Sequence, residues 1–484
     1  MRSLQHPRLR SRSEDAAGSS GTSHACRPAV ALRLVRRQDH GCTVKRDTGL
    51  ERVLMVCASE CNRRGMARPG VRRVCEAVFH DYDDRFHRAL LDGERPTPAA
   101  YDPELLIDEV VRLAEVAGAR GLTVTQDYPG ALVTAAAAER LGLPGPTVDS
   151  VLACQHKYLA RRLQRVTVPE ATPRFVRLGR RGRPPFGTLK TPLFAKPIRA
   201  NFSFGARRID SFAELAIHRQ RLALPEGYLR PLRWALSRSA HQVDGDPGDL
   251  LLEELLHGPQ VTLEGIAADG EIHMVGVVDS LFFPGTLAFE RFRYPSTLPA
   301  DIQARMLDIS SRFIRDIGFD GGLFNVELIA DTETGAVHIV EVNPRMCSQF
   351  ADMMEKVDGV NTYEHAARVA LGMRPRLRRG RGRYRVAASF PLRVFEDCRA
   401  ARVPTPREVA RLERAVPGVE AYVWVEAGRW LSSLLQDEQS FSYGRLNIGA
   451  RDEQELEEKR QACLRSLPFA FEPVATFESR RRSR

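Results

Sequence analysis

The sequence predicts a protein of mixed fold class, in which a small parallel α/β domain is followed by α+β units. Three observations lead to this prediction. After residue 50, a strand, helices and a second strand follow one another, an order typical of a parallel sheet. Residues 321–345 have the pattern of two antiparallel strands joined by a turn. Residues 386–475 combine strand and helix patterns and predict a smaller α+β unit.

The composition is typical of a soluble globular protein with roughly two to four domains. The chain has 484 residues, of which 43% are hydrophobic and 7% aromatic, and no apolar run approaches the roughly 18 residues of a membrane helix. The nine cysteines are scattered without a CxxC pair, and Cys57 and Cys61 are too isolated to suggest a zinc site. We therefore expect reduced thiols and a cytoplasmic protein.

The positive charge is concentrated in tails and a linker. The formal net charge is +11 for the whole chain, whereas residues 1–50, 374–385 and 480–484 together carry +17. The remainder is therefore mildly acidic, at −6. Because a nucleic-acid binder carries a basic folded surface, this distribution argues against nucleic acid as a partner.

The domain boundaries are predicted from shifts in composition. Residues 1–49 are rich in Arg, Ser and Gly and predict a disordered basic tail or an over-extended translation start. Residues 50–150 predict the N-terminal α/β domain, and residues 151–375 predict a large central domain. An Arg/Gly linker, the α+β subdomain and a second disordered tail are expected at residues 376–385, 386–475 and 476–484.

The N-terminal domain begins with an apolar run at residues 52–58 that predicts a buried strand. Helices are predicted at residues 70–82, 103–119 and 131–142, and a second strand with its loop at residues 122–130. Ligands of such domains bind at the carboxyl ends of the strands, where Asp127 lies. Asp127 is a candidate substrate residue, although an Asp before a helix is more often an N-cap.

Only six of the 72 basic residues are lysines, so each lysine is informative. A helix that follows a Pro/Gly hinge at residues 142–146 carries Lys157. Lys196 lies within an apolar strand, where it either snorkels from a sheet edge or points to an anion. The loop at residues 199–205 offers backbone and hydroxyl donors for phosphate, although its single glycine makes this a weak signal.

The rest of the central domain predicts a strand-rich meander and a long helix. Residues 211–224 predict a helix capped by Ser211, and strands are expected on both sides of the Gly258-Pro259 break. Residues 353–373 predict a loop followed by a helix. The long helix at residues 299–318 has an apolar stripe of Ile302, Met306, Ile309, Phe313 and Ile317.

The hairpin at residues 321–345 is predicted to bring acidic side chains face to face. If its turn is centred near Thr334, Glu327 and Glu341 stand opposite each other, and Asn343 lies on the same face. Like charges so arranged repel, so a cation or a proton usually lies between them. Two carboxylates and an amide oxygen suit Mg²⁺. A half-solvated hairpin is the alternative, and for a lone hairpin it is the commoner case.

The order of these features resembles the ATP-grasp superfamily. The most specific part is Glu327 followed by the string Glu341-Val-Asn-Pro-Arg345. The resemblance covers about residues 50–375 and is closest in type to carboxylate–amine (amino-acid) ligases, with similarity to biotin carboxylase around the same string. It implies an ATP-grasp domain at residues 151–375, in which two α+β subdomains clasp ATP.

The resemblance also implies a metal and substrate site. In such proteins two carboxylates and an Asn hold Mg²⁺, or Mn²⁺ in its place, on ATP. This implies Glu327, Glu341 and Asn343 as the metal ligands. Arg345 is implied to hold the acyl phosphate or the substrate carboxylate, because a guanidinium binds such anions through two hydrogen bonds.

A nucleotide site is implied as well. Lys157 and Lys196 resemble the two lysines that contact the nucleotide phosphates, and Lys196 is implied in catalysis together with Arg345. Gln260 stands where an acid that holds the ribose is usual, and His156 stands where Asp is common. The other implied contacts are Ser203 in the phosphate loop, and Glu253, Glu254 and the backbone of Leu255 and Leu256 at the adenine.

The implied activity is an ATP-dependent ligase that joins an amino acid or similar small carboxylic acid to an amine through an acyl phosphate. Its partners would be these small molecules, with no membrane, and with a homodimer as one expected assembly. Asp127, Glu290, Arg291 and Arg293 are candidates for the substrate pocket, together with Arg345.

Two other functions stay open. One is a biotin carboxylase-like enzyme that activates bicarbonate. The chain has no Met-Lys dipeptide, the usual biotin-accepting site, so such an enzyme would need a separate carrier. The other is a nucleotide-binding regulatory protein with a degenerate site, which the complete set of implied metal ligands disfavours.

Overall fold

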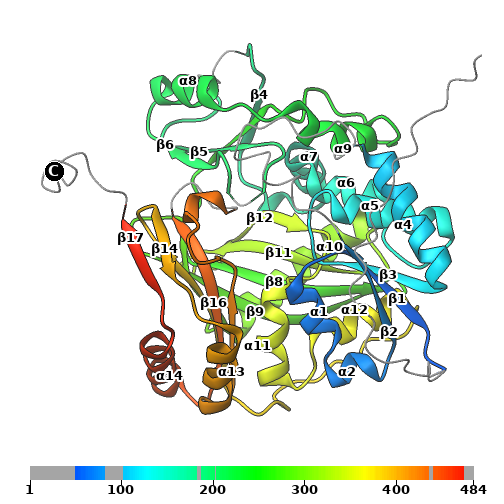
Figure 1. Cartoon of the computed structure of the whole chain (residues 1–484). Helices are drawn as coiled ribbons and strands as arrows, with labels where there is room; N and C mark the ends of the chain where they lie inside the picture. The colour runs from blue at the N-terminus through cyan, green and yellow to red at the C-terminus, as the bar shows by residue number, and fades with distance from the viewer. Residues whose placement is uncertain (1–48, 82–101, 183–186, 202, 435–439, 474–484) are drawn as a thin grey trace, which may run out of the picture. The chain divides into compact units, whose positions relative to one another are not determined.

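The computed structural model describes residues 49–81, 102–182, 187–201, 203–434 and 440–473. The predicted tail at residues 476–484, and all but Gly49 of the predicted tail at residues 1–49, lie outside this part of the chain. The described residues form a small parallel sheet, a four-stranded sheet, a large eight-stranded sheet and a two-stranded ribbon (Figure 1).

The N-terminal domain is built on a parallel sheet in the order β2-β1-β3. Its strands are β1 (Arg52–Ala58), β2 (Glu76–Asp81) and β3 (Ala119–Val124). Residues 53–56 of the middle strand are fully buried, because both faces of a central parallel strand are covered. The predicted parallel α/β domain is therefore confirmed.

The helix predicted at residues 70–82 is wrong. This segment contains only the short helix α2 (Pro69–Arg72) and then strand β2, whose Ala77, Val78 and Phe79 pair with β1. Pairing beside a buried strand outweighs the weak helical spacing of the segment.

In the described part of this domain, longer helices accompany the sheet at α1 (Glu60–Met66), α4 (Pro103–Ala117) and α5 (Gly130–Leu141). The helices predicted at residues 103–119 and 131–142 are thus confirmed. Both end at glycines in the left-handed conformation, Gly118 with φ 63° and Gly142 with φ 62°.

The single helix predicted around Lys157 is two helices, α6 (Val148–Gln155) and α7 (Lys157–Thr167). His156 separates them with an extended backbone, and its Nδ1 accepts the backbone N–H of Leu159 at 3.1 Å. The imidazole therefore acts as the N-cap of α7. Lys157 is the first residue of that helix.

The four-stranded sheet is antiparallel throughout, in the order β4-β7-β5-β6. Its strands are β4 (Phe175–Leu178), β5 (Leu193–Pro197), β6 (Arg207–Ile209) and β7 (Leu250–Glu254). Helices α8 (Phe212–Arg221) and α9 (Glu226–Leu236) connect β6 to β7. Ser211 caps α8 as predicted, since its side chain accepts the N–H of Glu214.

The eight-stranded sheet has the order β12-β11-β8-β9-β10-β13-β16-β15. Its strands are β8 (Gln260–Ala268), β9 (Glu271–Phe282), β10 (Phe289–Tyr294), β11 (Gly322–Ala330), β12 (Val337–Asn343), β13 (Val386–Val394), β15 (Val419–Val423) and β16 (Phe441–Ala450). Because β10 pairs with β13, one sheet contains strands from both sides of the Arg/Gly segment at residues 376–385.

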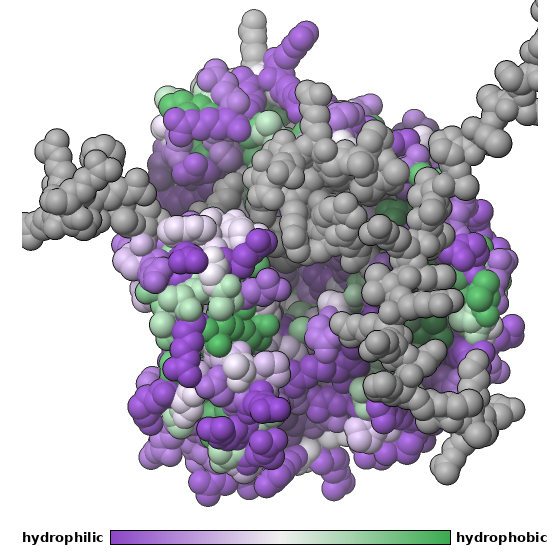
Figure 2. Space-filling model, viewed as in Figure 1, coloured by the Kyte–Doolittle hydropathy of each residue, from purple (hydrophilic) through white to green (hydrophobic). Residues whose placement is uncertain are grey.

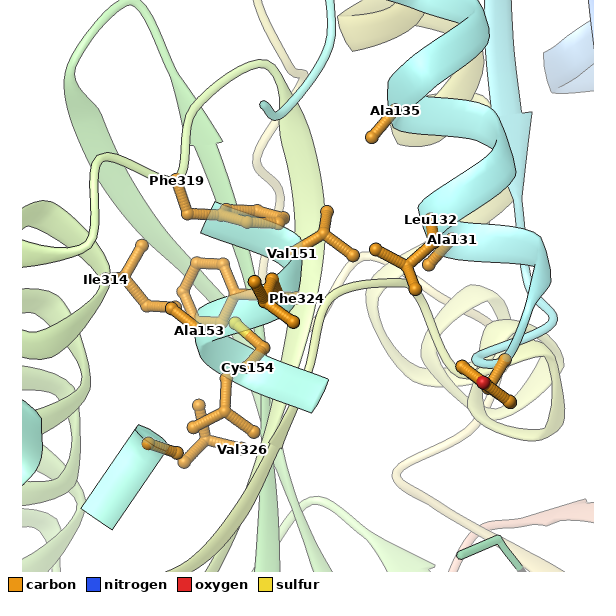
Figure 3. Packing of buried hydrophobic residues seen from close by; sticks show 14 of the residues in the cluster. Ala131, Leu132, Ala135, Val151, Ala153, Cys154, Ile314, Phe319, Phe324 and Val326 are labelled. Carbon is orange, nitrogen blue, oxygen red and sulfur yellow. The ribbon is translucent and has the colours of Figure 1, made fainter. Parts of the chain in front are cut away.

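One face of the large sheet packs against α10 (Ala300–Asp316) and α6. Figure 3 shows Val151 of α6 and Ile314 of α10 beside Phe324 of β11 in the main hydrophobic cluster. The predicted stripe of the long helix is buried at Ile302, Met306, Ile309 and Phe313.

The opposite face packs against α11 (Ser348–Asp358) and α12 (Thr362–Ala370). The predicted helix is confirmed as α12, but the loop predicted before it is mostly helix. Met353 and Met354 of α11 are fully buried against Ile266 and Leu323 of the sheet. Burial of this apolar face stabilises a helix where the sequence offered little local signal.

The C-terminal segments add α13 (Pro406–Ala415), α14 (Glu453–Ser466) and the antiparallel ribbon of β14 (Cys398–Arg402) and β17 (Ala470–Pro473). Hydrophilic residues cover most of the described surface seen in Figure 2, and hydrophobic residues form small patches on it. Among the described residues, no helix combines the length and apolar character needed to span a bilayer.

Candidate active site

The acidic hairpin has the predicted register. Glu327 of β11 lies opposite Glu341 of β12, and Asn325 lies opposite Asn343. The register shifts after Glu327, because Leu328 pairs with Ile339 and leaves Val340 as an extra residue. This bulge puts Glu341 on the same face as Glu327 while Ile339 still points into the core.

Glu327 and Glu341 differ in their protonation behaviour. Burial and the neighbouring Glu341 carboxylate raise the pKa of Glu327 to about 7. Burial alone would raise the pKa of Glu341 too, but the charges of Lys157 and Lys196 outweigh it and lower that pKa. Gln260 of β8 donates from Nε2 to Glu327 Oε2 at 3.0 Å. The site therefore holds one firmly anionic carboxylate beside one that is easily protonated.

Lys157 lies between the acidic hairpin and the loop after β5. Its Nζ is 3.3 Å from Glu341 Oε2 and donates to the carbonyl of Ala200, also at 3.3 Å. Ala200 belongs to the loop after β5, in which phosphate contacts are predicted. Because Lys157 is the first residue of α7, its ammonium reaches both the acidic hairpin and this loop.

Lys196 of β5 joins the four-stranded sheet to the large sheet. Its Nζ is 2.7 Å from Glu253 Oε2 on β7 and donates to the carbonyl of Val340 at 3.1 Å. Arg161 of α7 donates to the same two residues, to Glu253 Oε1 at 2.5 Å and to the Val340 carbonyl at 2.8 Å. The carbonyl of Val340, the bulged residue of β12, therefore links the large sheet to β5 and to α7.

The predicted metal ligands fit a divalent cation by donor type. The described residues contain no group of three or more His, Cys, Asp and Glu side chains with metal-site spacing. The hairpin instead offers the carboxylates of Glu327 and Glu341 and the amide of Asn343. Hard oxygen donors of this kind suit Mg²⁺, which usually completes its shell with water and phosphate oxygens.

Arg345 follows β12, and its charge acts on the carboxylates of Glu327, Asp127 and Glu264. Asp127, the predicted substrate residue after β3, forms an ion pair with the buried Arg199. Burial would raise the pKa of Asp127, but Arg199 and Arg345 outweigh it and lower that pKa. Three cations, Lys157, Arg199 and Arg345, therefore surround this carboxylate.

The predicted nucleotide contacts occupy the connection between the two sheets. Leu255 and Leu256 follow β7 and lead into β8, so they bridge the four-stranded and eight-stranded sheets. Glu254 faces the outside, where its Oε2 pairs with Arg174 Nε at 2.7 Å. Ser203 is exposed in the loop after β5, with a left-handed φ of 56°.

Two arginines predicted for the substrate pocket, Arg291 and Arg293, form ion pairs with other parts of the chain. Arg291 Nη1 is 3.4 Å from Glu453 Oε2 on α14, and Arg293 bonds to the same carboxylate. Arg293 also lies 3.7 Å from Asp279. Glu290 is half-buried on the same strand β10, where the pairing with β9 shifts register between Phe289 and Arg291.

Four buried polar residues at the site were not predicted from the sequence. They are Arg161, Arg199, Glu264 and Asn325, each at most 3% exposed. In a chain so rich in arginine, Arg161 and Arg199 carry no distinguishing signal. Glu264 and Asn325 do interrupt apolar strand patterns, and this interruption is the signal that could have identified them.

Comparison with known proteins identifies the fold of this chain. Residues 294–377, which include the hairpin, match the model of the ATP-binding domain of the carbamoyl-phosphate synthase L chain. The structure is similar to that of L-amino acid ligase from Bacillus licheniformis, with a TM-score of 0.66 and 17% identity over 87% of this chain and 99% of that one. The chain has the ATP-grasp fold.

Two further ATP-grasp structures are similar to it. Biotin carboxylase from Campylobacter jejuni gives a TM-score of 0.60 at 14% identity, over 87% of this chain and 92% of that one. Phosphoribosylglycinamide synthetase from Anaerococcus prevotii gives 0.59 at 12% identity, over 87% and 100%. The predicted resemblance and fold class are confirmed. The matched family model describes an ATP-binding domain, and the solved structures, at 12–17% identity, show the fold.

Proposed function

We propose that this protein is an ATP-dependent carboxylate–amine ligase that acts on an amino acid or a similar small carboxylic acid. The observation that carries the proposal is the pair of carboxylates Glu327 and Glu341, which face each other next to Lys157 of α7 and Lys196 of β5. Such a group of charges suits a metal–nucleotide complex, in which cations and phosphates alternate.

Glu327, Glu341 and Asn343 would hold the divalent metal. When bound, this ion neutralises charge on the phosphates of ATP. In its absence Lys157 supplies the positive charge next to Glu341, at 3.3 Å. We expect this ammonium to turn to a nucleotide phosphate when ATP binds, since phosphate is the stronger partner and the metal then neutralises Glu341.

From its position on β5, Lys196 would contact the phosphates of ATP. Its links to Glu253 and to the Val340 carbonyl hold the ammonium at the junction of the two halves. Burial lowers its pKa, against the opposing effect of Glu253. The ion pair with Glu253 keeps the charge where a phosphoryl group would be transferred.

Arg345 would bind the acid substrate. Its guanidinium lies near Asp127, whose charge is already balanced by Arg199, so Arg345 retains affinity for a second carboxylate. This charge balance supports a small acid rather than a neutral substrate. Asp127 then holds Arg199 rather than the substrate, a refinement of its predicted role.

The reaction would proceed in two steps. A carboxylate oxygen of the acid attacks the γ-phosphorus of ATP, the bond to the β,γ-bridging oxygen breaks, and an acyl phosphate and ADP result. The amine nitrogen then attacks the acyl carbon, the carbon–oxygen bond to phosphate breaks, and the amine gives up a proton as the amide forms. Positioning and charge neutralisation account for the rate in such a scheme, without a covalent enzyme intermediate.

The test measures ADP and phosphate release with panels of amino acids and other small acids, with amines, and with bicarbonate. We expect a small acid to stimulate ADP formation, and Glu341→Gln to reduce it by at least about 100-fold because the metal loses a charged ligand. The matched control is Glu333→Gln, in the exposed turn of the same hairpin, which should keep the parent rate.

The outcomes separate the competing functions. If bicarbonate alone stimulated ADP formation, the carboxylase alternative would replace the ligase. If nucleotide bound but no acid stimulated turnover, a regulatory protein would be favoured. If Glu341→Gln matched the parent, the proposed site would be wrong.

A further inference from the structure

Three polar side chains form a continuous row across the large sheet, beside the carboxylate pair. Glu264 of β8, Asn325 of β11 and Asn343 of β12 are direct neighbours in the strand register. Their side chains are almost inaccessible, with exposed fractions of 0%, 3% and 5%. Asn325 Nδ2 donates to Glu264 Oε2 at 2.8 Å, and Asn343 Nδ2 donates to Asn325 Oδ1 at 3.3 Å.

When Glu264 is ionised, its carboxylate fixes the direction of every hydrogen bond in this row. The N–H of Cys347 donates to Glu264 Oε1 at 2.8 Å, and a backbone N–H can only donate. An ionised Glu264 only accepts, so Asn325 must turn its NH₂ group toward it. The carbonyl of Asn325 then faces Asn343, and Asn343 must turn its own NH₂ group toward Asn325. The carbonyl oxygen of Asn343 is therefore directed away from the row.

The strand pairing gives this orientation a chemical meaning. Asn343 lies two residues beyond Glu341 on β12, so both side chains emerge on the same face of the sheet. An amide can bind a metal cation through its oxygen but not through its NH₂ group. An unconstrained Asn could present either group, and the wrong one would repel a cation.

We propose that Glu264 and Asn325 are positioning residues, which orient the amide of Asn343 so that its oxygen faces the divalent metal. This inference rests on the proposed function, because it assigns two further residues to the same metal site. Neither residue contacts the metal; each acts only through the hydrogen bond that it makes to the next residue of the row.

The burial of Glu264 supports a role beyond packing. Removal of a carboxylate from water is unfavourable, and burial raises the pKa of Glu264 to about 7. No Lys or Arg among the described residues forms a salt bridge with it within 4.0 Å. Its hydrogen-bond partners are an amide and a backbone N–H. A side chain that only filled space at this position would be more stable if it were neutral.

The substitution Glu264→Gln tests the proposal because it keeps the shape of the side chain but not the number of acceptors. The single oxygen of the introduced amide can accept from Cys347, which leaves its NH₂ group facing Asn325. Asn325 and Asn343 must then both turn over, and an NH₂ group faces the metal. The readout is the affinity of the protein–ADP complex for Mn²⁺, measured from free Mn²⁺ by electron paramagnetic resonance without turnover.

We expect Glu264→Gln to weaken Mn²⁺ binding by about 10-fold or more, as loss of outer-shell partners does. Its thermal unfolding temperature should equal or exceed that of the parent, because a buried carboxylate is lost. A merely structural role predicts unchanged Mn²⁺ affinity. Affinity within twofold of the parent would therefore overturn the proposal.

A second pair of variants tests orientation independently of charge. The carboxylate introduced by Asn343→Asp would present an oxygen to the metal whichever way the row is directed. In the background of Asn343→Asp, Glu264→Gln should therefore change Mn²⁺ affinity by less than about twofold, whereas in the parent it changes about 10-fold. Equal losses in both backgrounds would overturn the proposal. If the parent itself had no ADP-dependent Mn²⁺ site, the proposed function would fail instead, and this inference with it.

Discussion

Arg199 and Asp127 form a buried ion pair that joins the loop after β5 to the loop after β3. The guanidinium also lies 4.3 Å from the ring centre of Tyr128, whose hydroxyl donates to the carbonyl of Tyr228 at 2.7 Å. The loop after β5 is thus fastened to the N-terminal domain and to α9. Because the same loop accepts a hydrogen bond from Lys157, this pair helps to set the position of a predicted phosphate ligand.

We expect Asp127→Asn to destabilise the protein by about 3–5 kcal/mol, because it leaves the buried guanidinium of Arg199 without a counter-charge. The measurement is the shift of the urea unfolding midpoint. The matched control is Glu170→Gln, which breaks the exposed ion pair with Arg312 and should change stability by at most about 1 kcal/mol. Equal effects of the two substitutions would contradict the structural importance of the buried pair.

We expect Lys157→Met to weaken ATP binding by about 10- to 100-fold, since a charged hydrogen bond to phosphate is lost. Calorimetric titration with ATP and Mg²⁺ provides the measurement. Lys190→Met removes an exposed lysine just before β5 and should leave the affinity unchanged. An undiminished affinity in Lys157→Met would exclude this lysine from the nucleotide site.

His156 should make the protein sensitive to acid. Burial lowers the pKa of its imidazole to about 4, against an ordinary value of 6.5. At this imidazole the folded state binds fewer protons than the unfolded state between pH 6.5 and 4, so the contribution of His156 to stability is lost as the pH falls through that range. A pKa lowered by about 2.5 units corresponds to a loss of on the order of 3 kcal/mol in the free energy of unfolding.

His156→Asn should therefore remove this contribution, so that the parent loses stability relative to the variant as the pH falls from 6.5 to 4, while Asn still caps α7. Urea unfolding across this pH range is the measurement. The slope that remains combines His365, whose pKa burial lowers to about 4, with Glu264 and Glu327, whose raised pKa values act in the opposite direction. His257→Asn, at an exposed position in the connection between the sheets, should keep the parent slope. If His156→Asn kept it too, His156 would be protonated in the folded state.

We expect Phe313→Ala to destabilise the protein by about 3–5 kcal/mol, because the side chain is fully buried in the main hydrophobic cluster. Val166→Ala is the control, since Val166 is 82% exposed, and should change stability by less than about 0.5 kcal/mol. Urea unfolding monitored by circular dichroism compares the two. A small effect at Phe313 would argue against the packing of α10 on the large sheet.

The sequence by itself determined the acidic hairpin, the two lysines and the parallel N-terminal sheet. These features have local patterns, namely alternation along strands, rare residue types and turn residues. Such patterns can be recognised in the sequence without knowledge of the tertiary contacts. The prediction that Glu327 faces Glu341 is confirmed by the register, because a short turn leaves few ways to pair two strands. The roles assigned to Gln260, Glu254 and Arg345 stay predictions.

Only the tertiary structure decided how the site is supported. The bulge at Val340 cannot be seen in the alternation of β12, yet it lets Glu341 face the site while Ile339 stays in the core. The partners of Arg199 and Glu264 come from segments far apart in the chain, and the pairing of distant segments leaves no local signal. The acidic hairpin could be found in the sequence, but the contacts that orient it depend on the packing of the whole fold.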